Sequence, residues 1–222
     1  MAEQLERARA FARLHVPGSP LVLFNVWDAG SARAVAGAGA RALATGSHPV
    51  ASAHGYEDGE KIPLDLALAN LERIVGAVDL PVSVDLEAGY GARPEAVFET
   101  VTRALSAGAV GCNLEDRVLG TSGLFPVAES AARIREARAA AWAAAGLFVP
   151  GLADEARIAR LCAASPLPIN LFAGPDGPSL VRLAELGAAR ISHGPIPWKL
   201  AMKALAEAAR AAHGALSGRA VP

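Results

Sequence analysis

The chain has 222 residues, a formal net charge of −1 at pH 7 and a hydrophobic fraction of 52%. This length is sufficient for one large domain with a sizeable core. The nearly balanced charge gives no basis for a nucleic-acid partner, and no apolar run approaches the roughly 20 residues that a membrane span needs. We therefore expect a single domain over residues 1–222 in the cytoplasm, with neither a nucleic-acid nor a membrane partner.

Strand-like and helix-like segments alternate along the chain after a charged, helix-like N-terminal stretch. The predicted strands are 21–26, 42–47, 80–87, 109–116, 147–152, 167–173 and 190–194. The predicted helices are 31–39, 64–78, 94–107, 127–145, 154–164, 179–186 and 197–212. Because the strands are apolar nearly throughout and each is followed by a helix, this pattern indicates an α/β protein with a parallel sheet covered by helices.

Two architectures fit this alternation, a (β/α)8 TIM-type barrel and a doubly wound open sheet. No Gly-x-Gly-x-x-Gly turn follows the first strand, where the sequence reads NVWDAGSA. Polar residues instead follow many strands, and a barrel gathers all such strand ends at one mouth. We therefore predict the barrel.

The strand count is one short of eight. The interval between the fourth and fifth predicted strands is unusually long and holds one helical stretch, VAESAARIREARAAAWAAAG. We predict that one βα unit is missing between about residues 138 and 147, either by a natural deletion or because the printed sequence omits it. A barrel cannot omit a strand without repacking, so a natural deletion would affect both barrel closure and catalysis.

Two acids close an apolar strand in the stretch PVSVDLEAGYG. Asp85 and Glu87 are two residues apart, so in an extended chain they point to the same face. The next strand ends in GCNLED and contributes Glu115. Carboxylates that converge on one barrel mouth repel one another unless a cation is present, and Mg²⁺ takes oxygen ligands. The alternative is that these acids pair with arginines or cap the following helices.

Three loops could complete a site at this mouth. The loop ATGSHPV contains Gly46 and Ser47, whose backbone N–H groups could hold a carboxylate or phosphate, although it could also be a tight turn. The loop HGYEDGE contains Asp58, which could reach the mouth or lie in an exposed turn. The loop DRVLGTSGLFP contains Arg117 and could be a lid or a plain connection. Cys112 should point away from the mouth, so we do not expect a cysteine nucleophile.

Several stretches in order resemble the isocitrate lyase/phosphoenolpyruvate mutase superfamily, including members such as carboxyvinyl-carboxyphosphonate phosphorylmutase. They are NVWDAGSARAVAGAGARALATGS, GYEDGE, LPVSVDLEAGYG, GAVGCNLED, LFVPGLADEARIARL, LPINLFAGP and LAELGAARISHGP. The resemblance covers about residues 10–210. It implies a (β/α)8 barrel that binds Mg²⁺, with Mn²⁺ as an alternative, and a 2-oxo acid, its enolate or a phosphonate.

The resemblance also assigns roles to residues. It implies that Asp85 ligates the metal and that Glu87 and Glu115 hold it largely through water. Asp58, which matches an acid of the superfamily's active-site mouth, and Arg117, which is the only cation candidate in the lid loop, are the candidate catalytic residues. The candidate substrate-binding residues are Trp27, Thr45, Gly46, Ser47 and His48. It further implies a homo-oligomer, a dimer or tetramer, in which a C-terminal helix near residues 197–212 is swapped between subunits.

The chain departs from the superfamily pattern in two places. Its lid loop lacks the Lys-Lys/Arg-Cys-Gly-His sequence of the C–C lyases that act on isocitrate or methylisocitrate. The Asn-Ala-Arg-like strand after the fourth helix is also absent, at the place where the strand count is short. Three hypotheses follow: a Mg²⁺-dependent lyase-type enzyme that cleaves or rearranges a C–C or P–C bond through an enolate, a phosphonomutase, and a degenerate barrel that only binds a metabolite.

Overall fold

The computed structural model describes residues 2–140 and 146–217. Its strands are β1 (Leu21–Leu23), β2 (Leu43–Ala44), β3 (Val82–Asp85), β4 (Gly111–Asn113), β5 (Leu147–Val149), β6 (Ile169–Phe172) and β7 (Arg190–Ser192). Its helices are α1 (Ala2–Arg13), α2 (Ala29–Gly37), α3 (Ser47–Ala53), α4 (Leu64–Gly76), α5 (Pro94–Ser106), α6 (Val127–Ala140), α7 (Glu155–Ala164), α8 (Leu180–Glu185) and α9 (Ile196–Ser217). The predicted alternation of strands and helices is confirmed, with strands shorter than expected.

The strands follow the order of a parallel barrel. One sheet has the order β2-β3-β4 and the other β1-β7-β6-β5, and every strand pair is parallel. A parallel bridge between Val26 and Thr45 connects the two sheets just beyond β1 and β2. The resulting order is β4-β3-β2-β1-β7-β6-β5, in which β1 pairs with the last strand as barrel closure requires. The fold is therefore the predicted parallel α/β type.

Strand pairing is interrupted at one point of this order. Among the described residues, no strand pairs with the outer edge of β4 or of β5. The residues of β4 are only partly buried and Leu147 of β5 is 42% exposed, whereas β7 is fully buried. This interruption of strand pairing between β4 and β5 falls where the sequence predicts a missing βα unit, and residues 141–145 of that interval lie outside the described residues.

Alternating side chains along the strands build two different cores. Leu43 and Val82 face outward and pack with Ile74 of α4 in the largest hydrophobic cluster. Their neighbours face inward, where Ala42 and Ala44 contact Phe11 of α1. This alternation is the two-residue period of a β-strand. Helix α1 thus covers the end of the barrel that lies opposite the strand carboxyl ends.

Two local predictions were wrong. The stretch Ala44–Val50 is not a loop throughout, because α3 begins at Ser47. Glu87 is not part of an extended strand, because β3 ends at Asp85 and Glu87 has a left-handed φ of 49°. Ser47 lies shortly after β2 and Glu87 shortly after β3, and the local sequence pattern does not determine at which residue a strand ends.

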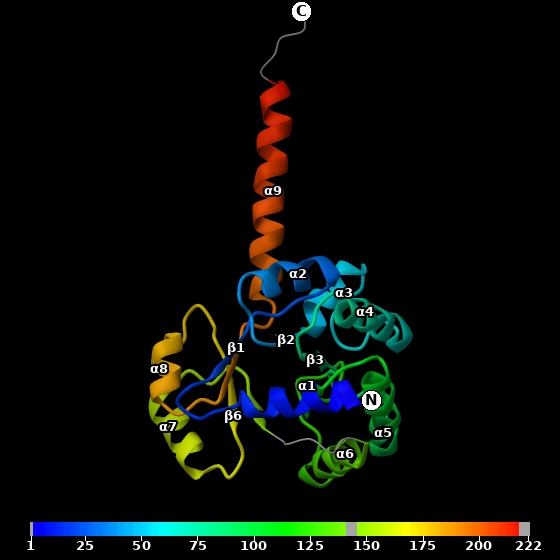
Figure 1. Ribbon diagram of the computed structural model, residues 1–222, viewed down its shortest axis with the longest axis vertical. Helices are drawn as coiled ribbons and strands as arrows, with labels where there is room; N and C mark the ends of the chain where they lie inside the picture. The colour runs from blue at the N-terminus through cyan, green and yellow to red at the C-terminus, as the bar shows by residue number, and fades with distance from the viewer. Residues whose placement is uncertain (1, 141–145, 218–222) are drawn as a thin grey trace, which may run out of the picture.

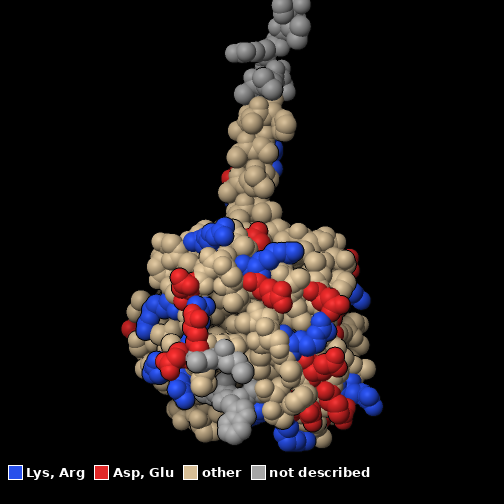
Figure 2. All heavy atoms as spheres, turned by 45° about the vertical axis from the view of Figure 1, so that its right-hand side comes forward, with Lys and Arg blue, Asp and Glu red and all other residues tan. Residues whose placement is uncertain are grey.

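Helix α9 projects from the body of the molecule, and few charged side chains line it (Figures 1 and 2). Its side chains Leu200 and Leu205 are largely exposed. The outer face of β1 is also incompletely covered, since Val22 and Phe24 are exposed. None of the helices in the described ranges is long and apolar enough to cross a membrane.

Candidate active site

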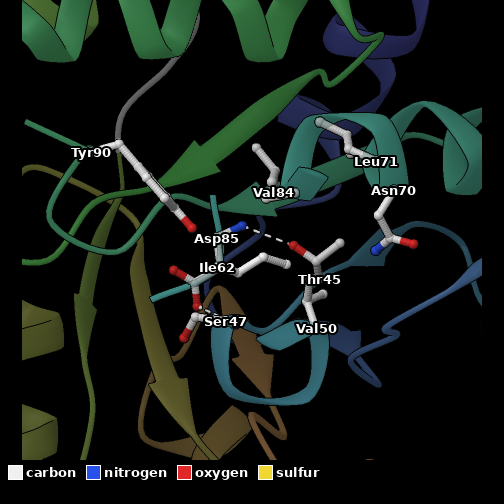
Figure 3. Close-up of a pocket in the computed structure, with 10 residues that line it drawn as sticks. Thr45, Ser47, Val50, Ile62, Asn70, Leu71, Val84, Asp85 and Tyr90 are labelled. Carbon is white, nitrogen blue, oxygen red and sulfur yellow. Dashed lines mark hydrogen bonds between the residues drawn. The ribbon is translucent and has the colours of Figure 1, made fainter. Parts of the chain in front are cut away.

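Asp85 occupies the carboxyl end of β3, and three backbone contacts fix its position. Its N–H donates to Thr45 Oγ1 over 3.0 Å, and its Oδ2 accepts from the N–H of Ser47 at 3.3 Å (Figure 3). Its Oδ1 accepts from the N–H of Glu87 at 3.1 Å. The carboxylate therefore lies between the ends of β2 and β3, as a residue at a parallel-strand mouth should.

Glu87 is held by a second acid that the sequence analysis did not select. Its Oε1 accepts from the N–H of Glu60 at 2.9 Å, and Glu60 Oε1 in turn accepts from the N–H of Tyr90 at 2.7 Å. Glu60, Glu87 and Tyr90 are the non-glycine residues with positive φ in the described chain. Such strained backbone is costly and concentrates at functional sites. Within the HGYEDGE loop, Glu60 makes these direct contacts, and the role predicted for Asp58 stays a prediction.

The carboxyls at this mouth strongly influence one another. Burial, followed by the charges of Asp58, Asp85 and Glu60, raises the pKa of Glu87 to about 7. Burial and the charges of Asp85 and Asp58 raise the pKa of Glu115 to about 6. Burial also raises the pKa values of Asp85 and Glu60. We call these five residues, Asp58, Glu60, Asp85, Glu87 and Glu115, the acid set.

The acid set predicts an unusual pH dependence for the metal-free protein. A folded state with a raised Glu87 pKa binds more protons than the unfolded chain between about pH 4.5 and 7. The contribution of Glu87 to the free energy of unfolding should therefore fall as pH rises through this window. Urea unfolding in EDTA should show that Glu87→Gln reduces this slope. The exposed Glu72→Gln should leave the slope unchanged, and an equal slope in all three proteins would contradict the prediction.

A buried arginine fixes the loop that follows the acids. Arg133 on α6 is 3% exposed, and it donates hydrogen bonds of 3.0–3.1 Å to three loop carbonyls. These are the carbonyls of Ala88, Gly91 and Ala92. Its guanidinium also lies 4.1 Å from the centre of the Phe125 ring. The sequence analysis missed Arg133, because on a helix rich in arginine nothing local distinguishes it.

Asn25 joins three strand ends at the mouth. Its Nδ2 donates to the Thr45 carbonyl at 2.9 Å, and its Oδ1 accepts from the N–H groups of His193 and Gly194 at 3.1 and 2.8 Å. It is almost fully buried. This network connects β1 to β2 and β7, so the mouth is rigid beside Asp85.

A pocket opens beside the acids (Figure 3). Thr45, Ser47, Asp85 and Tyr90 supply its polar lining, and apolar side chains complete it. The apolar lining consists of Val50, Ile62, Ala67, Leu71 and Val84, with Asn70 beside them. Asp85 thus forms the polar end of a small pocket whose other walls are largely apolar.

The other predicted site residues differ in their exposure and in the residues that they contact. Gly46 precedes α3, and a Cβ there would lie 3.2 Å from Pro49. Asp58 is exposed but close enough to shift the pKa values of the acids. Arg117 is exposed and its charge opposes the rise in the Glu115 pKa. Trp27 packs edge-on against Trp198, with ring centres 5.2 Å apart.

The described residues hold no preassembled metal centre. No three His, Cys, Asp or Glu side chains among residues 2–140 and 146–217 are grouped closely enough to hold a metal ion. His48 is partly buried at the start of α3. Its side chain forms no hydrogen bond or ion pair with the described residues of the acid set. Direct metal ligation by Asp85, and metal binding largely through water by Glu87 and Glu115, therefore remain predictions.

Enzymes with a parallel α/β barrel fold carry their active site at the carboxyl ends of the strands, and this chain has its acids there. The family model described as phosphoenolpyruvate phosphomutase matches residues 11–145 and 143–213. The chain belongs to this family, within the phosphoenolpyruvate mutase/isocitrate lyase superfamily of mutases and lyases. This confirms the family and the enzyme class predicted from the sequence.

Three relatives illustrate the similarity. A crystal structure of a candidate phosphonomutase from Burkholderia cenocepacia J2315 is 46% identical, with a TM-score of 0.91, and the match covers 94% of this chain and 99% of that one. An uncharacterised Mycobacterium tuberculosis protein is 32% identical over 91% of this chain and 88% of its own length. The 2-methylisocitrate lyase of Escherichia coli K12 is 31% identical over 50% of this chain and 38% of its own.

The comparisons also bear on the interval between β4 and β5. The family model matches the chain in two segments, which overlap at residues 143–145 in this interval. The alignment with the M. tuberculosis protein extends over 234 positions but covers 91% of 222 residues, which is about 202 residues. About 30 positions of that alignment therefore have no counterpart in this chain.

Proposed function

We propose that this protein is a Mg²⁺-dependent lyase-type enzyme that cleaves or rearranges a C–C or P–C bond next to a 2-oxo acid. The observation that carries the proposal is the acid set, in which burial and then the charges of neighbouring carboxylates raise the pKa values of Asp85, Glu87 and Glu115 beside a pocket that Asp85 lines. Such mutual repulsion favours a bound cation. Membership of a family of mutases and lyases supports the same chemistry.

The acid set fits Mg²⁺ better than a metal ion that several protein side chains coordinate directly. The acids influence one another's charges, yet no three of them are grouped for direct coordination within the described residues. Mg²⁺ commonly keeps several waters and is held by one or two carboxylates. Asp85 would hold the ion directly, and Glu87 and Glu115 would hold it through water, with Mn²⁺ as a substitute. Bound there, the ion would stabilise the negative charge of an enolate.

The residues around the proposed metal position would orient Asp85, bind the substrate and transfer a proton. The N–H of Ser47 and the hydroxyl of Thr45 hold Asp85 in place, so the carboxylate is oriented before a ligand arrives. Gly46, Ser47, His48 and Trp27 would contact the substrate carboxylate or phosphonate. Asp58 at the rim would transfer a proton, and Arg117 would neutralise the leaving group. These assignments follow from their places at the mouth and from the resemblance.

A panel of small 2-oxo acids and their phosphonate analogues tests the proposal. We expect Mg²⁺-dependent release of an enolate-derived product, such as pyruvate, detected by ¹H NMR, and its loss in EDTA. Phosphorus NMR with phosphoenolpyruvate tests the phosphonomutase alternative, because a P–C product has a distinct signal. Mg²⁺ binding without turnover on the whole panel would instead support a degenerate barrel, for which the lack of a strand partner at the outer edges of β4 and β5 among the described residues gives a structural reason.

We also propose that α9 packs against a second copy of the chain. Leu200 and Leu205 are exposed on a helix that projects from the body, and Val22 and Phe24 are uncovered on β1. Burying such side chains contributes about 25 cal/mol per Å² of apolar area. Light scattering should show an oligomer that Leu200→Lys with Leu205→Lys converts to a monomer. The exposed Lys203→Ala should leave the oligomer intact, and a monomeric wild type would contradict the proposal.

A further inference from the structure

Glu60 links two loops that both carry members of the acid set. It lies two residues after Asp58 in the loop between α3 and α4, and its partners lie in the loop that follows β3. Its N–H donates to Glu87 Oε1 at 2.9 Å, and its Oε1 accepts from the N–H of Tyr90 at 2.7 Å. Carboxylate acceptors form stronger hydrogen bonds than neutral oxygens do. Because Glu60 contributes one donor and one acceptor, the two loops cannot separate without the loss of both bonds.

The backbone at both ends of these hydrogen bonds is left-handed. The φ angles of Glu60, Glu87 and Tyr90 are 57°, 49° and 55°, and within residues 2–140 and 146–217 no other non-glycine residue has a positive φ. A residue with a Cβ adopts this conformation at a cost in energy, and the conformation persists only where surrounding contacts stabilise it. The hydrogen bonds of Glu60 connect all three residues, so we expect their conformations to depend on one another.

Opposite charges hold the two sides of the loop after β3. On one side, the guanidinium of Arg133 binds three of its carbonyls. On the other side, burial raises the pKa of Glu60, and the N–H groups of residues 88–90 oppose this rise. Successive N–H groups that face one anion form a nest. The Glu60 carboxylate is therefore the anion around which the N–H side of this loop is folded.

Glu60 also restricts how Glu87 presents its carboxylate. The N–H of Glu60 occupies Glu87 Oε1, and no hydrogen bond within the described part of the chain involves Glu87 Oε2. With one oxygen fixed, the carboxylate rotates less and Oε2 keeps one direction. A glutamate side chain loses rotamer freedom when it binds a ligand, and fixing it in advance reduces that cost. Tyr90 is fixed at its N–H, and its side chain extends toward Asp85 (Figure 3).

We propose that Glu60 is a positioning residue for the metal site. Its N–H fixes the Glu87 carboxylate, and its own carboxylate holds the loop after β3 in the left-handed conformation that places Glu87 and Tyr90 at the mouth. The metal in this inference rests on the proposed function, whereas the coupling of the two loops does not. Glu60 performs this task without contact to the ion.

Amide hydrogen exchange in EDTA tests the coupling of the two loops. Glu60→Ala removes the acceptor and keeps the unfavourable backbone, so exchange at Tyr90 and in the loop 86–92 should accelerate by about tenfold or more. Glu60→Gln keeps an acceptor oxygen and should restore most of the protection. Glu57→Ala is the matched control, since Glu57 is exposed in the same loop as Glu60, and it should exchange as the wild type does.

Electron paramagnetic resonance with Mn²⁺ as the probe tests the positioning role. Glu60→Ala should weaken Mn²⁺ binding by about tenfold, as the loss of a residue that orients a metal ligand typically does. Glu60→Gln should weaken binding less, and Glu57→Ala should bind as the wild type does. If Glu60→Ala does not fold, Glu60→Gly decides the question, because glycine adopts a φ of 57° freely and also lacks the carboxylate.

Unchanged exchange in Glu60→Ala would overturn the coupling of the loops. Faster exchange together with unchanged Mn²⁺ binding would overturn the positioning role. A failure of the proposed function looks different, because the wild type itself would then bind no Mn²⁺. Faster exchange in Glu60→Ala would in that case still support the coupling, since it is measured without metal.

Discussion

Replacing Asp85 by Asn should lower Mg²⁺-dependent turnover by about 10³-fold or more, which corresponds to about 4 kcal/mol of transition-state stabilisation. The change keeps the side-chain shape and one acceptor oxygen, so one of the two hydrogen bonds from the N–H groups of Ser47 and Glu87 can remain, but it removes the charge that would hold the cation. The loss should appear in kcat/KM for the active 2-oxo acid and in Mg²⁺ affinity measured by calorimetry.

A surface acid provides the control for this prediction. Asp79 is fully exposed and forms a weak pair with Arg7 at 3.6 Å, remote from the acid set. Asp79→Asn should therefore retain both turnover and Mg²⁺ affinity. If Asp85→Asn kept more than a tenth of the activity, Asp85 could not be the direct metal ligand, and Glu87 or Glu115 would become the next candidate.

Replacing Arg133 by Met should lower the free energy of unfolding by about 3 kcal/mol. Met fills much of the same volume but leaves the carbonyls of Ala88, Gly91 and Ala92 without their donor. It also removes the cation–π contact with Phe125. For a domain of this size the loss should lower Tm by roughly 6–12 °C. Urea unfolding and calorimetry measure the two quantities.

Arg135 on the same helix is the matched control for Arg133. It is exposed, so Arg135→Met should change the free energy of unfolding by less than about 0.5 kcal/mol. A similar small change for Arg133→Met would show that water replaces its hydrogen bonds to the loop. The loop would then not depend on α6 for its conformation.

The local pattern of the sequence was sufficient to predict the order of the strands and the helices between them. Apolar runs of period two and helical runs of period 3.6 predicted all seven described strands, and their alternation predicted the parallel sheet. The shortage of one strand was also visible, because the interval after β4 holds a helix and no further strand signal. The structure places the free strand edges at that point.

The candidate site was predictable only in part. Asp85 was identifiable because an acid at the end of an apolar strand is conspicuous, and parallel strand ends share one edge. Glu60 was not, because its contacts are to Glu87 and Tyr90, 27 and 30 residues away. The left-handed backbone of Glu87 was equally hidden, since only surrounding contacts stabilise such a conformation in a non-glycine residue.

The sequence by itself determined the strands, the helices and the presence of acids at one end of the sheet. These depend on periodicity and composition over a few neighbouring residues. Only the tertiary structure decided that Arg133 fixes the loop after the acids and that Arg190 spans the interior to Asn113, 77 residues away. The reason is physical: a buried hydrogen bond between distant segments depends on how the strands close around it, and no local pattern records that closure.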